Sequence, residues 1–205
     1  MEETLFPLLS LVRLRMGSDG QGVTTLVAGA GCPLSCRWCI NKRLLREAPV
    51  EHLTAAELLE RVRIDDLYFR ASGGGVTFGG GESLLHAAFI RSFRQICPEE
   101  WRICAETSLA VPEKQLRIAA EAVDGFIVDC KDMDPEIYHR YTDGDGELMH
   151  SNLRLLLEVV GPERVTVRVP LIPGYNTADD QAKSAEFLRE LGVEKLDLFE
   201  YVVRE

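Results

Sequence analysis

The chain has 205 residues, a formal net charge of −10 at pH 7, 46% hydrophobic and 27% charged residues. This balance is that of a soluble globular protein with enough residues to bury a substantial core. We find no linker or repeat, so a single domain over 1–205 is expected. The acidic balance argues against nucleic acid or an anionic membrane surface as the main partner, because both recruit Lys and Arg.

An apolar stretch near the N-terminus, Leu5–Leu14, is interrupted by Pro7 and Arg13, and no small-residue cleavage site follows it. No apolar run in the chain approaches the roughly 18 residues of a membrane span. We therefore expect no signal peptide, no membrane helix and a cytoplasmic location.

Short apolar runs bounded by Gly, Pro or charge predict six buried strands. In chain order these are Val23–Ala28, Val76–Phe78, Arg102–Ala105, Phe126–Val128, Val165–Val169 and Lys195–Phe199. Capping and stop signals predict helices between them, at Ala55–Val62, Leu84–Ile96, Pro112–Val123, Ser151–Val160 and Thr177–Leu191. This alternation predicts an α/β fold with a parallel sheet. A full eight-unit barrel usually needs about 250 residues, so six units indicate a partial, open (β/α)6 TIM-like barrel with its active residues at the C-terminal ends of strands.

Three of the six cysteines, Cys32, Cys36 and Cys39, fall within eight residues directly after the first predicted strand. Disulfide scaffolds are typical of short secreted chains, so clustered thiols point here to a metal. Structural zinc prefers four ligands in paired knuckles, which the three scattered cysteines elsewhere do not supply. Three ligands on one loop favour a [4Fe–4S] cluster with one open iron, and a zinc-stabilised α/β binding module is the alternative.

A glycine-rich stretch, Ser72–Glu82, spans the second predicted strand and contains two runs of three glycines. Glycines at a strand end let the backbone approach a ligand closely. No Lys-Ser or Lys-Thr pair follows, so the stretch is not a phosphate-binding loop. A flexible turn before the next helix is the structural alternative.

The C-x3-C-x2-C spacing, with Trp38 before the third cysteine, together with Gly80-Gly81-Glu82, resembles the radical S-adenosylmethionine (SAM) superfamily. The resemblance implies that the open iron chelates the methionine moiety of SAM. An electron from the cluster then cleaves SAM to methionine and a 5′-deoxyadenosyl radical. It also implies that Trp38 lies beside the adenine, and that Gly80, Gly81 and Glu82 bind the methionine ammonium.

Further motifs resemble the glycyl-radical-enzyme activating enzymes, above all the pyruvate formate-lyase activating enzyme family, from about residue 19 to residue 201. They are Asp19–Gly22, Asn41, Ala71–Thr77, Glu106-Thr107, Asp129–Lys131, Arg168 and Pro173-Gly174. The resemblance implies hydrogen abstraction from a glycine of a glycyl-radical enzyme as protein substrate. It also implies a flavodoxin or ferredoxin-type electron donor.

Charged residues at the ends of apolar strands are poor core residues and are expected to face a ligand, with surface ion pairs as the alternative. By the resemblance, Asp129 meets the SAM ribose and Lys131 meets a carboxylate. A monovalent cation would lie on Glu106, Thr107 and Asp129, although the family more often has Asp in place of Glu106. Asp19 and Arg168 would contact the substrate backbone, with turn formation as the alternative for Asp19.

Two departures from the family pattern stand out. Val202 occupies the place of a family His, and the chain stops at Glu205, where relatives continue into a helical portion. No second cysteine cluster is present, so Cys97, Cys104 and Cys130 are expected to be buried core residues. A minimal radical SAM enzyme that modifies a small molecule or peptide is therefore an alternative to an activating enzyme.

Overall fold

The computed structural model describes residues 4–202 and is built around one eight-stranded sheet in the order β3-β1-β2-β4-β5-β6-β7-β8. Strand β1 runs antiparallel to both of its neighbours, and the strands from β2 through β8 are parallel. The bounds are β1 Phe6–Met16, β2 Val23–Gly29, β3 Glu51–Leu53, β4 Gly75–Gly80, β5 Arg102–Thr107, β6 Gly125–Asp129, β7 Val165–Leu171 and β8 Lys195–Glu200. The parallel, open arrangement is the one predicted from the sequence.

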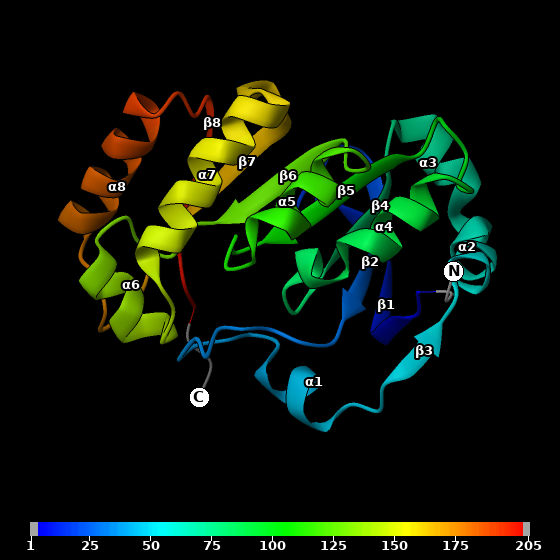
Figure 1. Ribbon diagram of the computed structural model, residues 1–205, viewed down its shortest axis with the longest axis horizontal. Helices are drawn as coiled ribbons and strands as arrows, with labels where there is room; N and C mark the ends of the chain where they lie inside the picture. The colour runs from blue at the N-terminus through cyan, green and yellow to red at the C-terminus, as the bar shows by residue number, and fades with distance from the viewer. Residues whose placement is uncertain (1–3, 203–205) are drawn as a thin grey trace.

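Helices follow the parallel strands and lie together over one face of the sheet, as Figure 1 shows for α4, α5, α7 and α8. The α-helices are α1 Lys42–Glu47, α2 Ala55–Val62, α3 Asp66–Ser72, α4 Ala87–Arg94, α5 Glu113–Ala120, α6 Pro135–Thr142, α7 Gly146–Val160 and α8 Ala178–Glu190. Three 3₁₀ turns complete the set, at Arg63–Asp65, Ser83–His86 and Pro162–Arg164. Of the helices within residues 4–202, none is both long and apolar enough to cross a lipid bilayer.

Alternation along the strands gives the sheet two different faces. Side chains such as Ile103, Val128 and Val167 are fully buried under the helices and form the core. The intervening residues point to the inner, concave face, where many are polar. Because the sheet does not close, this inner face remains open and the carboxyl ends of the strands meet along one rim.

Several elements differ from the sequence expectation. All of the apolar stretch Leu5–Leu14 except Leu5 lies within strand β1, whose pairing with β2 and β3 adds an antiparallel edge to the six predicted strands. Helix α7 begins at Gly146, five residues before the predicted start, because the Asp145 side chain caps the amides of Glu147 and Leu148. The predicted helix at 84–96 is shorter, since a 3₁₀ turn occupies 83–86. Helices α1, α3 and α6 and strand β3 were not predicted.

Candidate functional site

The cysteine loop, residues 30–41, leaves the end of β2 and crosses the rim of the sheet. It is held at both sides by backbone hydrogen bonds, from Ala30 N to Pro7 O (2.9 Å) and from Ser35 N to Thr142 O (2.8 Å). The three thiols line an open cavity of about 120 Å³ at the carboxyl ends of the strands. The lining residues are Cys32, Leu34, Cys36, Trp38, Cys39, Ile40, Asn41, Gly80, Gly81, Glu82, Glu106, Thr107, Ser108, Asp129, Lys131, Tyr141 and Tyr201. The cavity thus joins nearly all of the predicted site residues.

The thiols of this loop lie in a partly buried environment. Burial raises the pKa of Cys32 and raises that of Cys36 to about 11, while the nearby Lys131 opposes both shifts. Metal or cluster binding must therefore displace protons from these groups. Within residues 4–202, no group of three or more His, Cys, Asp or Glu side chains is arranged closely enough to hold a metal ion. Cys32, Cys36 and Cys39 nevertheless line one cavity, and three thiols are the protein ligands that a [4Fe–4S] cluster with one open iron requires.

The glycine-rich end of β4 is bonded directly to the base of the cysteine loop. Gly81 N donates to Gly29 O (3.0 Å) and Glu82 N donates to Gly31 O (2.8 Å). On the other side of the loop, Asn41 Nδ2 donates to Gly80 O (2.7 Å). The two sequence motifs therefore form one hydrogen-bonded unit, with their polar groups facing the same cavity.

This junction requires glycine at position 81. A Cβ on Gly81 would lie 2.1 Å from Gly31 O, far inside contact distance. We expect Gly81→Ala to push the two backbones apart and to destabilise the fold by about 1–3 kcal/mol, seen as a lower midpoint in denaturant unfolding. Gly174→Ala is the comparison: a Cβ there meets open space, so its cost comes from the positive φ of Gly174, which Gly81 does not share. A Gly81→Ala midpoint equal to that of the wild type would contradict this packing.

Glu82 is buried and its carboxylate is turned toward the end of β5. It accepts hydrogen bonds from Leu84 N (3.1 Å), Thr107 Oγ1 (2.6 Å), Ser108 N (2.8 Å) and Ser108 Oγ (2.6 Å). These four donors match the acceptor capacity of a carboxylate. Burial nevertheless raises the pKa of Glu82 against their opposing effect. Its role in this arrangement is to fasten β4 to β5 behind the Gly80–Gly81 backbone.

The charged residues at the ends of β5 and β6 have different partners. Lys131 Nζ donates to Asp129 Oδ2 (3.2 Å) and to Tyr201 Oη (3.0 Å). Thr107 bonds to Glu82, so its hydroxyl is not turned to Asp129. The cation site on Glu106, Thr107 and Asp129 stays a prediction. Trp38 lies at the rim, where its Nε1 donates to Pro173 O (3.2 Å).

Arg168 lies on β7, on the inner face of the sheet, and its guanidinium reaches acids on β5 and β6. Its Nη1 donates to Glu106 Oε1 (2.9 Å) and lies 3.8 Å from Asp129 Oδ1. Burial raises the pKa of Glu106, and the Arg168 charge opposes that shift. Asp19 is 2% exposed and pairs with Arg15 rather than with Arg168. Their contact with a substrate stays a prediction.

Sequence reasoning missed several members of the site. Ser108 supplies two of the donors to Glu82, and Tyr201 holds Lys131 from the end of β8. Arg15 pairs with Asp19 from β1, a strand that was not predicted. The position of Ser108 directly after the Glu106-Thr107 strand end was an available signal. The expected burial of Cys97, Cys104 and Cys130 is confirmed.

Comparison with known proteins identifies a family and several relatives of this chain. Residues 26–188 match the model of the radical SAM superfamily. The chain is 37% identical over 146 residues to the (2S)-3-sulfopropanediol dehydratase activating enzyme of Klebsiella oxytoca, covering 68% of this chain and 44% of that protein. It is 30% identical over 189 residues to the pyruvate formate-lyase 1-activating enzyme of Escherichia coli K12, covering 89% and 76%.

A solved structure shares the fold. The crystal structure of Streptococcus suis SuiB bound to precursor peptide SuiA has a TM-score of 0.66 at 14% identity, covering 86% of this chain and 38% of SuiB. At that identity the likeness concerns the fold alone. The chain also spans less than half the length of the sulfopropanediol relative. The family match, the relatives and the joined cysteine and glycine motifs agree, and the chain belongs to the radical SAM superfamily, whose members use a [4Fe–4S] cluster and SAM.

Proposed function

We propose that the chain is a glycyl-radical-enzyme activating enzyme that holds one [4Fe–4S] cluster on Cys32, Cys36 and Cys39. The observation that carries the proposal is the set of backbone hydrogen bonds between this loop and Gly81-Glu82. They bring the thiols and the glycine-rich strand end into one cavity. Relatives at 37% and 30% identity are named activating enzymes, which supports the protein substrate.

When bound, the cluster and SAM supply a 5′-deoxyadenosyl radical that abstracts hydrogen. The residues of the chain itself bind SAM and orient it. The backbone at Gly80 and Gly81 offers acceptors to an ammonium group, and Asn41 fixes the Gly80 carbonyl from the other side. Lys131 brings a positive charge into the cavity for a carboxylate, and Asp129 accepts hydrogen bonds from hydroxyl groups.

The substrate glycine would reach the cavity on an extended backbone along the open inner face. Arg168, half-way along that face, has donors for peptide carbonyls, and Asp19 has acceptors for peptide amides. The electron donor, of the flavodoxin or ferredoxin type, would approach the outside of the cysteine loop. There Cys32 is exposed and the Ile40 side chain is 93% exposed.

The test is anaerobic incubation of the reconstituted protein with SAM, a reductant and a candidate glycyl-radical enzyme. We expect one deoxyadenosine for each radical formed, and a glycine-centred doublet in the electron paramagnetic resonance spectrum of the partner. Deoxyadenosine formation without a protein radical for any such partner would contradict the activating function and favour a small-molecule or peptide substrate.

Arg168→Gln is expected to lower the yield of glycyl radical by about tenfold or more, and to lower deoxyadenosine formation less. The substitution removes the positive charge that lies between Glu106 and Asp129 and offsets their repulsion, so the Glu106 pKa rises further. Both products are measured in the same reaction. Arg117→Gln, on the exposed surface of α5, is the control. An unchanged ratio of radical to deoxyadenosine would remove Arg168 from the substrate path.

A further inference from the structure

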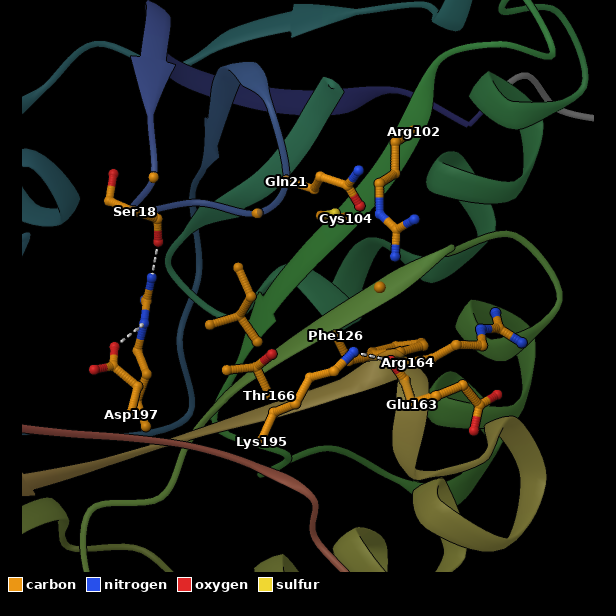
Figure 2. A pocket seen from close by; sticks show the side chains of 15 residues that line it. Ser18, Gln21, Arg102, Cys104, Phe126, Glu163, Arg164, Thr166, Lys195 and Asp197 are labelled. Carbon is orange, nitrogen blue, oxygen red and sulfur yellow. Dashed lines mark hydrogen bonds and ion pairs between the residues drawn. The ribbon is translucent and has the colours of Figure 1, made fainter. Parts of the chain in front are cut away.

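The inner face of the sheet carries a second cavity, at the opposite ends of β5 to β8 from the thiol loop. It is an open hollow of about 240 Å³. Figure 2 shows Arg102 and Lys195 extending toward it from different strands, with Phe126 and Thr166 between them. The hollow lies beyond Arg168, which lines this cavity and bonds to Glu106 in the other one.

Gly125 makes the space in the floor of this hollow. A Cβ at position 125 would lie 3.3 Å from Arg102 Nη2 and 3.3 Å from Cys104 Sγ. Gly125 is not among the residues with positive φ, so its backbone conformation does not demand glycine. The absence of a side chain instead leaves room beside the Arg102 guanidinium.

Two of the cations that line this hollow have no ion-pair partner within residues 4–202, although Glu163 and Asp197 also line it. Arg102 and Lys195 have no carboxylate oxygen within 4.0 Å among the described residues, and their polar partners are the backbone carbonyls of Asp124 and Glu163. Arg168, by contrast, is paired with acids. Other cations, such as Lys42 and Arg154, also have no carboxylate partner among the described residues, but Arg102 and Lys195 are distinguished by lining one hollow together.

The neutral hydroxyl of Thr166 adds a hydrogen-bond donor to the two cations of the hollow. Thr166 pairs in register with Lys195, so both side chains project from the same face of neighbouring strands. In the described part of the chain the Thr166 hydroxyl makes no hydrogen bond. An ammonium, a guanidinium and a hydroxyl around a hollow are the groups that bind carboxylate or phosphate oxygens.

We propose that this cavity binds a small dianion through Arg102, Lys195 and Thr166. The two cations stand on different walls, so the fitting ligand carries two negative charges, either as a dicarboxylate or as a phosphate group. The hollow is smaller than a typical drug-sized site, which suits a compact dianion. The site is separate from the thiol loop and does not depend on the cluster.

Calorimetric titration of the anaerobically reconstituted protein tests this proposal, with succinate and inorganic phosphate as separate probes in a low-chloride zwitterionic buffer at pH 7. Saturable binding of either probe supports it, and the probe that binds identifies the ligand chemistry. The absence of saturable binding by both probes up to about 10 mM overturns it.

Substitutions in the hollow test whether the probe binds there. Arg102→Gln and Lys195→Gln are each expected to weaken binding about tenfold or more. Gly125→Ala, which keeps every charge, is expected to weaken it by filling the floor. Lys183→Gln, an exposed residue of α8, is the charge control. Melting temperatures confirm that each variant is folded. Binding that all three cavity variants leave unchanged overturns the assignment.

The titration needs neither SAM nor a reductant, so its outcome is independent of the activating function. A protein that binds succinate but forms no glycyl radical would retain this site and lose the proposed function. A protein that forms the radical but binds neither anion would keep the proposed activating function and lose this anion site.

Discussion

Cys36→Ala is expected to reduce the iron of the anaerobically reconstituted protein from about four atoms per chain to a small residual amount. Cys36 is the middle one of the three proposed ligands, and it lines the same cavity as Lys131. The remaining cysteines cannot replace it, because Cys97, Cys104 and Cys130 are buried elsewhere. Iron and sulfide assays and the absorbance near 400 nm measure the loss.

The matched control is Cys97→Ala, which removes a thiol at the end of α4, away from the cavity. It is expected to keep the full iron content and to lose a modest amount of stability, since the thiol is 7% exposed and packs in the core. Full iron content in Cys36→Ala, or loss of iron in Cys97→Ala, would contradict the ligand assignment.

Glu82→Ala is expected to lower the free energy of unfolding by at least about 3 kcal/mol, because each buried donor left without a partner costs about 1–3 kcal/mol. The carboxylate accepts from Leu84, Thr107 and Ser108, and Glu82 itself is 2% exposed. Its removal leaves donors from two segments unpaired and releases β4 from β5.

Denaturant unfolding of the cluster-free protein measures this effect without contribution from the cofactor. Glu100→Ala, on the surface between α4 and β5, is the control and is expected to change stability by about 0.5 kcal/mol or less. A Glu82→Ala change below about 1 kcal/mol would show that the carboxylate does not hold the strand ends together.

The sequence predicted the parallel part of the sheet well, because each buried strand there is a short apolar run between Gly, Pro or charge. Val23–Ala28 and Val165–Val169, for example, lie within strands β2 and β7. The sequence also predicted that the site residues lie close together, because the carboxyl ends of parallel strands meet at one rim of the sheet. That topology brings the cysteine loop, Gly80–Glu82 and Asp129–Lys131 to one cavity.

Other features depend on partners that no local pattern reveals. Strand β1 carries an apolar run, but its pairing with β2 is set by tertiary contacts. Three of the four donors to Glu82 come from residues 107–108, some 25 positions away, while its contact with an ammonium stays a prediction. Asp19 pairs with Arg15, four residues earlier, across the turn between β1 and β2. The hollow over Gly125 is lined by residues from β5 to β8, which only the tertiary fold brings together.

The quantity of 5′-deoxyadenosine that the reduced, cluster-loaded protein forms from SAM tests directly whether the cysteine loop holds a cluster that cleaves SAM. We expect deoxyadenosine and methionine in equal amounts, dependent on the reductant and lost in Cys36→Ala. A protein that carries its full iron and sulfide yet forms no more deoxyadenosine than Cys36→Ala would contradict the central claim.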